Sequence, residues 1–166
     1  MMGAVAETLQ KQTAVRIRWM IGHDMAKVLG IEAECFRHPW TVADFLRCLR
    51  QRNCIGMVAD YENQIVGFMI YELHKNRIHV LDFAVAKDHR RRGVGRQMVA
   101  KLVAKLSSNR RTRIVLDVPE KNLDAQLFLR ALGFRATQVL REPYPVAKGD
   151  AYRFELSFDE NATQPH

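Results

Sequence analysis

The chain has 166 residues, of which 48% are hydrophobic and 27% charged, and its formal net charge at pH 7 is +8. This length and composition are typical of one globular domain that buries a core without disulfide or metal staples. No apolar run approaches the length of a membrane span, so we expect a cytoplasmic protein without a membrane partner. Three cysteines, Cys35, Cys48 and Cys54, are an odd number, which favours reduced thiols.

The first third of the chain predicts one strand and two helices. Apolar and basic residues alternate over 15–20, as in a half-buried strand, and a helical pattern follows over 22–36. Pro39 ends that helix. Thr41 with Asp44 three residues later can cap a second helix.

The middle of the chain predicts three strands in succession and then a helix. Residues 55–60 and 64–73 form a hairpin around a short polar turn. A third strand, over 77–86, leads into a loop with two glycines. An amphipathic helix follows the loop and ends near Ser107.

The last third predicts three strands and one helix. A short apolar strand at 112–118 comes after the amphipathic helix, so the strands at both ends of that helix should pair in parallel. A helix over 123–132 is closed by Gly133, and strands at 136–140 and 150–158 complete a mixed α/β sheet of about seven strands with four helices. We expect one domain over 15–158 between disordered tails at 1–14 and 159–166.

The most basic stretch begins where the 77–86 strand ends. Ten Lys or Arg residues lie between Lys87 and Arg113 against one acid, Asp88. The segment Arg90-Arg91-Arg92-Gly93-Val94-Gly95-Arg96 joins the strand to its helix. Glycines let backbone amides approach a ligand, a helix N-terminus is partly positive, and arginine adds bidentate donors. The loop therefore predicts a site for a phosphate or pyrophosphate, although charge alone would also attract acidic protein or nucleic acid.

The sequence lacks the motifs of dinucleotide, triphosphate, metal and serine-nucleophile sites. A dinucleotide fingerprint needs a third glycine where Met98 stands, and the triphosphate-binding motif needs Lys-Ser or Lys-Thr after its last glycine. We expect no metal centre, because His74 and His79 lie five residues apart across a predicted turn and Cys35-x-x-His38 has no second pair. No serine stands in a nucleophile elbow.

The pattern Arg90-x-x-Gly93-x-Gly95 after an apolar strand resembles the acetyl-coenzyme A loop of the GNAT N-acetyltransferase superfamily, which shares the predicted element order. Further segments resemble its ribosomal-protein alanine N-acetyltransferase (RimI-like) branch. They are Glu34-Cys35-Phe36-x-x-Pro39-Trp40, Ala84-Val85, Leu116-Asp117-Val118, Asn122-x-x-Ala125 with Leu132-Gly133-Phe134, and Arg141-x-x-Tyr144-Pro145. The resemblance covers about 16–158 and implies a GNAT fold, an acetyltransferase and acetyl-coenzyme A as co-substrate, with no metal.

The resemblance also implies which residues bind acetyl-coenzyme A. The strand end would pair with the pantetheine arm, and the loop amides would bind the pyrophosphate. Asn122 would order the thioester region, cap the helix that follows it, or do both. The implied cofactor-binding residues are Phe83, Ala84, Val85, Arg90, Arg91, Arg92, Gly93, Val94, Gly95, Arg96, Asn122 and Leu129.

The family's base and acid are less closely matched. Asp117 stands where the RimI-like branch has its general-base glutamate and, one methylene shorter, would act through a water. Its alternative role is an ion pair with a nearby arginine. His79, Asp82 and Glu120 are alternative bases with no motif behind them.

Leu129 replaces the tyrosine that protonates the leaving thiolate in the family, so a water or Tyr144 would have to donate that proton. The resemblance places Phe36, Trp40 and Tyr144 at the substrate entrance, with core packing as the alternative for the first two.

We therefore predict acetyl transfer to a primary amine, in particular the α-amine of a protein N-terminus, a ribosomal protein being one candidate. With a pKa of about 8, an α-amine is partly neutral at pH 7 and needs only a weak base. The alternatives are a small-molecule amine substrate and a coenzyme A-binding sensor with weakened catalysis. Nucleic-acid binding by the basic helix is not expected. The chain could be a monomer or a homodimer.

Overall fold

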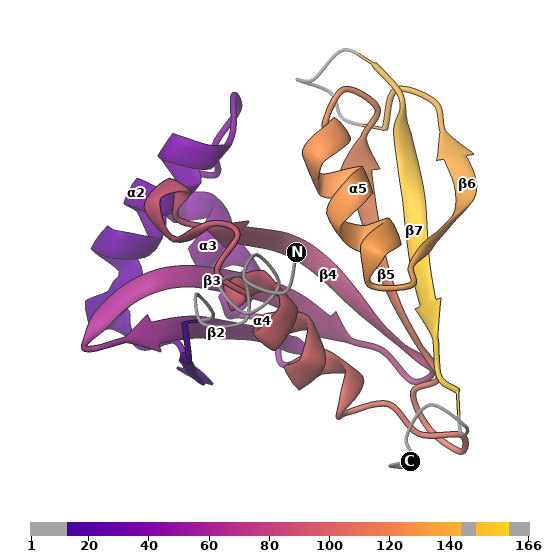
Figure 1. Ribbon diagram of the computed structural model, residues 1–166, viewed down its shortest axis with the longest axis horizontal. Helices are drawn as coiled ribbons and strands as arrows, with labels where there is room; N and C mark the ends of the chain where they lie inside the picture. The colour runs from indigo at the N-terminus through magenta and orange to yellow at the C-terminus, as the bar shows by residue number, and fades with distance from the viewer. Residues whose placement is uncertain (1–12, 144–148, 160–166) are drawn as a thin grey trace, which may run out of the picture. The chain divides into compact units, whose positions relative to one another are not determined.

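The computed structural model describes residues 13–143 and 149–159, and these contain seven strands and four α-helices (Figure 1). The strands are β1 (Arg16–Trp19), β2 (Cys54–Tyr61), β3 (Gln64–Leu73), β4 (Arg77–Val85), β5 (Arg113–Pro119), β6 (Arg135–Leu140) and β7 (Ala151–Ser157). The helices are α2 (Met25–Cys35), α3 (Val42–Leu49), α4 (Val94–Val103) and α5 (Leu123–Ala131), with 3-10 turns η1 (Gly22–Asp24) and η2 (Lys87–His89). This order confirms the predicted mixed α/β fold. No helix in the described part combines the length and apolar character needed to cross a bilayer.

Two predicted helix ends differ from the structure. The helix expected from residue 22 begins with the 3-10 turn η1, where the Asp24 carboxylate accepts a hydrogen bond from the Ile21 amide and two from the Arg18 guanidinium. The helix expected to reach about Ser107 ends at Val103, because the amides of Lys105 and Leu106 donate to carbonyls only three residues back. Such bonds tighten the last turn of a helix.

Hydrogen-bonded neighbours in the sheet follow the order β1-β2-β3-β4-β5-β7-β6. β4 and β5 pair in parallel, as predicted for two strands joined by a crossover helix, and their paired residues run from Arg77 with Arg113 to Val80 with Leu116. β5 and β6 each pair antiparallel with β7.

The chain forms two compact units, and β3 and β4 each contribute to both. The first unit contains the described residues up to Ile70 and the segment Asp82–Lys101. Its buried core includes Phe45 and Phe68, whose rings meet edge to face 5.7 Å apart. The predicted capping box of α3 is present, since the Thr41 hydroxyl accepts from the Asp44 amide and the Asp44 carboxylate accepts from the Thr41 amide.

The second unit contains Tyr71–Leu81 and the described residues from Leu102 onward. Ile78, Ile114 and Phe154 are buried in it, one from each of three adjacent strands. α5 ends at Ala131, and Gly133, two residues later, has a φ of +95°, the left-handed conformation common after a helix. The predicted tails 1–14 and 159–166 lie almost wholly outside the described residues, and Thr13 is hydrogen-bonded to Arg92.

Candidate active site

The glycine loop lies between the end of β4 and the start of α4, in the first unit. Arg91 and Gly93 have φ values of +61° and +80°, so the chain turns sharply just before the helix. The Gln97 amide makes a helical bond to the Gly93 carbonyl. The amides of the first helical turn have no intrahelical acceptor, which gives this loop the donors that an anion needs.

The strand end that precedes the loop is anchored inside the first unit. Ala84 is buried, whereas its neighbours Phe83 and Val85 are half-buried on the opposite face. Beyond them the Ala86 amide donates to the Val66 carbonyl. The three residues predicted to contact the pantetheine arm are therefore held in place by the sheet.

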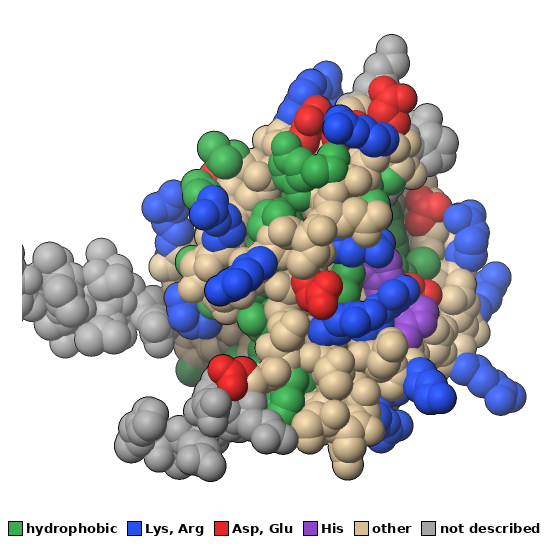
Figure 2. Space-filling view, turned by 90° about the vertical axis from the view of Figure 1, so that its right-hand side faces the viewer, with side chains coloured by type: hydrophobic (Ala, Val, Ile, Leu, Met, Phe, Trp, Pro, Cys, Tyr) green, Lys and Arg blue, Asp and Glu red, His purple; other side chains and the backbone are tan. Residues whose placement is uncertain are grey.

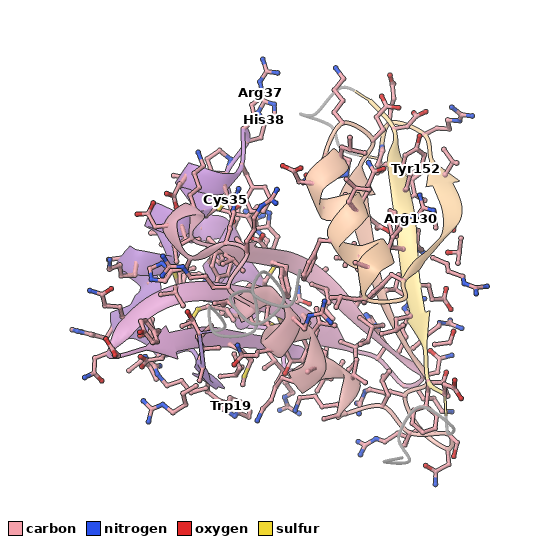
Figure 3. All side chains as sticks on the ribbon, viewed as in Figure 1. Trp19, Cys35, Arg37, His38, Arg130 and Tyr152 are labelled. Atoms are coloured by element: carbon pink, nitrogen blue, oxygen red, sulfur yellow. The ribbon has the colours of Figure 1, made fainter. Side chains whose placement is uncertain are left out.

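Arg90 and Cys35 stabilise the base of the loop. Cys35 is the last residue of α2 (Figure 3). The Arg90 guanidinium donates to the Val85 carbonyl at 3.2 Å and to Cys35 Sγ at 3.1 Å, and the Cys35 thiol donates to the same carbonyl at 3.4 Å. Burial raises the pKa of the Cys35 thiol, although Arg90 opposes the shift. Arg90 thus ties the end of α2 to the end of β4, in addition to any contact with phosphate.

Gln97 is a positioning residue that sequence reasoning missed. Its side-chain amide donates to the Thr13 carbonyl at 2.6 Å and to the Gly93 carbonyl at 3.0 Å, and its side-chain oxygen accepts from the Val15 amide at 3.1 Å. The chain before β1 is thereby fastened to the loop. No local pattern could reveal this, because the partners are more than eighty residues apart.

Asp117, the predicted base, forms an ion pair across two strands of the second unit. It stands opposite Arg153 in the β5–β7 register, and the guanidinium contacts both carboxylate oxygens, at 2.8 and 3.1 Å. His79 Nε2 lies 3.7 Å from Oδ2 of the same carboxylate. Partial burial alone would raise the pKa of Asp117, but His79 and Arg153 outweigh it and lower the pKa to about 2.

Asn122 and Leu129 both belong to α5. The Asn122 side-chain oxygen accepts from the Ala125 amide at 3.2 Å, which confirms the capping role considered for it. Leu129 is buried and has no proton to donate.

The alternative bases differ in exposure. Asp82 is buried with its carboxyl group facing that of Glu32, so it belongs to the core of the first unit. Glu120 is exposed just beyond β5. His79 remains half-buried beside Asp117.

Two of the residues predicted at the substrate entrance, Phe36 and Trp40, lie within the first unit. The Trp40 ring meets Phe45 edge to face at 5.1 Å, and its amide donates to Glu32 Oε1 at 2.9 Å. Phe36 is half-buried at the end of α2. Tyr144 lies outside the described residues.

A parallel strand pair whose crossover helix begins with a glycine–arginine loop can bind a phosphorylated cofactor. Residues 25–134 match the acetyltransferase (GNAT) family, and the chain belongs to this family.

Within the GNAT family, the chain is similar to several N-acetyltransferases. The ribosomal protein bS18-alanine N-acetyltransferase of Salmonella typhimurium is 25% identical over 126 residues, 76% of this chain and 84% of that protein. The Escherichia coli ribosomal-protein-S18-alanine N-acetyltransferase structure has a TM-score of 0.77 at 22% identity, covering 89% of this chain and 98% of that one. Arabidopsis thaliana Naa50 in complex with the bisubstrate analogue CoA-Ac-MVNAL has a TM-score of 0.74 at 19% identity, covering 88% and 100%. These matches confirm the GNAT fold and the RimI-like resemblance.

Proposed function

We propose that this chain moves the acetyl group of acetyl-coenzyme A to the α-amine of a protein N-terminus. The observation that carries this proposal is the loop from Arg90 to Gly95, which follows β4 and the turn η2 and places arginines at the N-terminus of α4 in a GNAT family member. The names of the relatives support a protein as the acetyl acceptor. One relative is a ribosomal protein bS18-alanine N-acetyltransferase, and Naa50 is in complex with the bisubstrate analogue CoA-Ac-MVNAL.

The reaction needs a neutral amine and a proton acceptor. The amine nitrogen attacks the acetyl carbonyl carbon, the carbon–sulfur bond breaks, and the amine's proton leaves as the coenzyme A thiolate departs and is protonated. With no hydroxyl on Leu129, a water is the donor we propose for the thiolate. Loss of a positioned acid slows such a step by about 10²–10⁴-fold without preventing it.

Two arrangements could remove the amine's proton. Asp117 could accept it through a water, as predicted from the sequence, or His79 could accept it with Asp117 orienting the imidazole. Arg153 contacts both oxygens of Asp117, which leaves fewer of its lone pairs for a water. This contact favours His79 as the acceptor and Asp117 as its positioning residue.

The acceptor is tested with the full chain and acetyl-coenzyme A, by mass spectrometry of a panel of peptides with different first residues. A matched panel carries the same peptides with a blocked N-terminus and one free lysine, and a third contains small amines. We expect acetylation of free N-termini above both other panels. Preference for small amines would favour a metabolite substrate, and binding of acetyl-coenzyme A without turnover of any amine would favour a sensor.

A further inference from the structure

Three side chains near the β3–β4 hairpin form a cluster with the composition of a metal site. Glu72 Oε1 lies 3.5 Å from His74 Nε2 and 3.8 Å from His79 Nδ1, and the three ligand atoms all lie within 4.8 Å of one another. All three residues belong to the second unit. Histidine side chains reach the surface among those of lysine and arginine (Figure 2).

The hairpin itself brings the cluster together. The His74 amide donates to the Arg77 carbonyl, which closes a turn between β3 and β4. Two residues further from the turn on each strand, Glu72 and His79 face each other. Glu72 and His74 are two apart and so project from the same face. The spacing of five residues between His74 and His79 argued against a metal site in the sequence. The turn nevertheless brings the two side chains to the same place.

The distances are close to those a zinc ion requires. Ligand atoms bound tetrahedrally at about 2.0–2.2 Å from zinc are separated by ~3.4 Å, so small side-chain rotations would suffice. Two imidazoles and one carboxylate form a known zinc ligand set with a fourth position open to water. Imidazole nitrogens disfavour magnesium and calcium, which prefer oxygen ligands.

Two further observations point to a ligand here. His74 Nε2 is buried and has no hydrogen-bond partner, as expected for an atom that binds a cation. The other ring nitrogen of His79, Nε2, faces the Asp117 carboxylate at 3.7 Å. A carboxylate behind a metal-binding histidine fixes its orientation and strengthens its binding. Asp117 is itself held by Arg153.

We propose that Glu72, His74 and His79 bind one zinc ion, with Asp117 supporting His79. Zinc bound to His79 takes the imidazole lone pair, so the bound ion inhibits acetyl transfer. This consequence rests on the proposed function, whereas the binding of zinc does not.

The binding is tested on the full chain without a histidine tag, first treated with a chelator. Zinc chloride is titrated by calorimetry, and cobalt chloride by visible absorption as a probe of coordination geometry. We expect one equivalent of zinc and a tetrahedral cobalt spectrum. His74→Ala should weaken zinc binding roughly tenfold or more. His23→Ala, which changes an exposed histidine of the first unit, is the matched control and should bind as wild type does.

Absence of saturable binding, or unchanged binding by His74→Ala, would overturn the proposal. If circular dichroism shows that His74→Ala does not fold, Glu72→Gln replaces it, with the same expected loss. In the acetyl-transfer assay, zinc should inhibit the wild type at the concentrations at which it binds and leave His74→Ala active. Failure of all acetyl transfer would count against the proposed function, while the cobalt spectrum would still judge the zinc site.

Discussion

Asp117 and His79 lie side by side, but their neighbours differ, and so does their ability to accept a proton. Arg153 contacts both oxygens of the Asp117 carboxylate, and the pKa of that carboxylate is lowered to about 2 by His79 and Arg153 against the effect of burial. Asp117 therefore stays ionised throughout an assay range of about pH 5 to 9. Any loss of activity at low pH must arise from protonation of another group.

The two residues can be separated by substitution. We expect His79→Gln to lower kcat by about 10²-fold or more, because it removes the proposed proton acceptor. Asp117→Asn should also lower kcat, by less than His79→Gln, because it removes the group that orients the imidazole and leaves the proton acceptor in place. The pH profile of kcat/KM should change shape in His79→Gln. A larger loss in Asp117→Asn, with His79→Gln near wild type, would instead support water-mediated transfer to Asp117.

Asp82 illustrates a carboxyl group that the fold keeps neutral. Burial, then its interaction with Glu32, raises the pKa of Asp82 well above its usual range. One oxygen of each carboxyl group, Glu32 Oε2 and Asp82 Oδ2, is buried without a donor. A proton on Asp82 satisfies both, so the pair shares one proton and Asp82 is unsuited to accept another.

Asp82→Asn should therefore stabilise the protein in a pH-dependent way. The folded-state pKa lies above the unfolded value near ~4, so the contribution of the protonated form is complete below pH ~4 and is lost as the pH rises through the folded-state pKa. Asparagine stays neutral and can donate to Glu32. Thermal unfolding should show a gain in Tm at pH 8 that is absent at pH 4. The same substitution at exposed Asp88 is the control and should change Tm little at either pH.

Residue types and their order predicted the loop, because glycines, arginines and an amphipathic helix are local signals. The partners of Asp117, Asp82 and Gln97 come from distant segments, which the sequence cannot pair. The sequence predicted an ion pair of Asp117 with an arginine only as the alternative to a role as general base. Glu72, His74 and His79 come together only when the turn between β3 and β4 forms, so their spacing in the sequence does not reveal that they are neighbours.

At the scale of elements, α4 can approach the sheet because β3 carries a glycine where the helix crosses. A Cβ at Gly67 would lie 3.0 Å from the Ala84 carbonyl oxygen and 3.1 Å from Met98 Sδ. The carbonyl is backbone and cannot move without shifting β4. Gly67 therefore helps to set how the strand end and the helix of the glycine loop sit together within the first unit.

Gly67→Ala should lower the free energy of unfolding by about 1–3 kcal/mol, as overpacking does. Gly30→Ala is the matched control, because Gly30 is an exposed residue inside α2 with nothing within 4 Å of its missing Cβ. That substitution should stabilise by about 0.5–1 kcal/mol. Urea denaturation of both variants measures the difference. Equal effects of the two substitutions would contradict the packing described for β3 and α4.

The strands and helices lie within a few residues of their predicted positions. Periodicity and caps are local features of the sequence, as at Thr41 and Gly133. The ends of α2 and α4 were less predictable. Arg18 and Asp24 convert the start of one helix into a 3-10 turn, and this contact joins two separate elements.

At the scale of the molecule, the chain is a GNAT family member with two compact units that share β3 and β4. The glycine loop belongs to the first unit, and the acid–histidine cluster belongs to the second. We propose that the chain binds acetyl-coenzyme A through the glycine loop, and the proposed acetyl transfer depends on this binding.

The most direct test is calorimetric titration of acetyl-coenzyme A into the full chain and two glycine variants. Gly93 and Gly133 both have positive φ, +80° and +95°, so alanine imposes a similar backbone strain of about 1–2 kcal/mol at either site. If the loop binds acetyl-coenzyme A, we expect saturable binding by the wild type, roughly tenfold weaker binding by Gly93→Ala, and wild-type affinity in Gly133→Ala. No binding by the wild type, or equal losses in both variants, would contradict it.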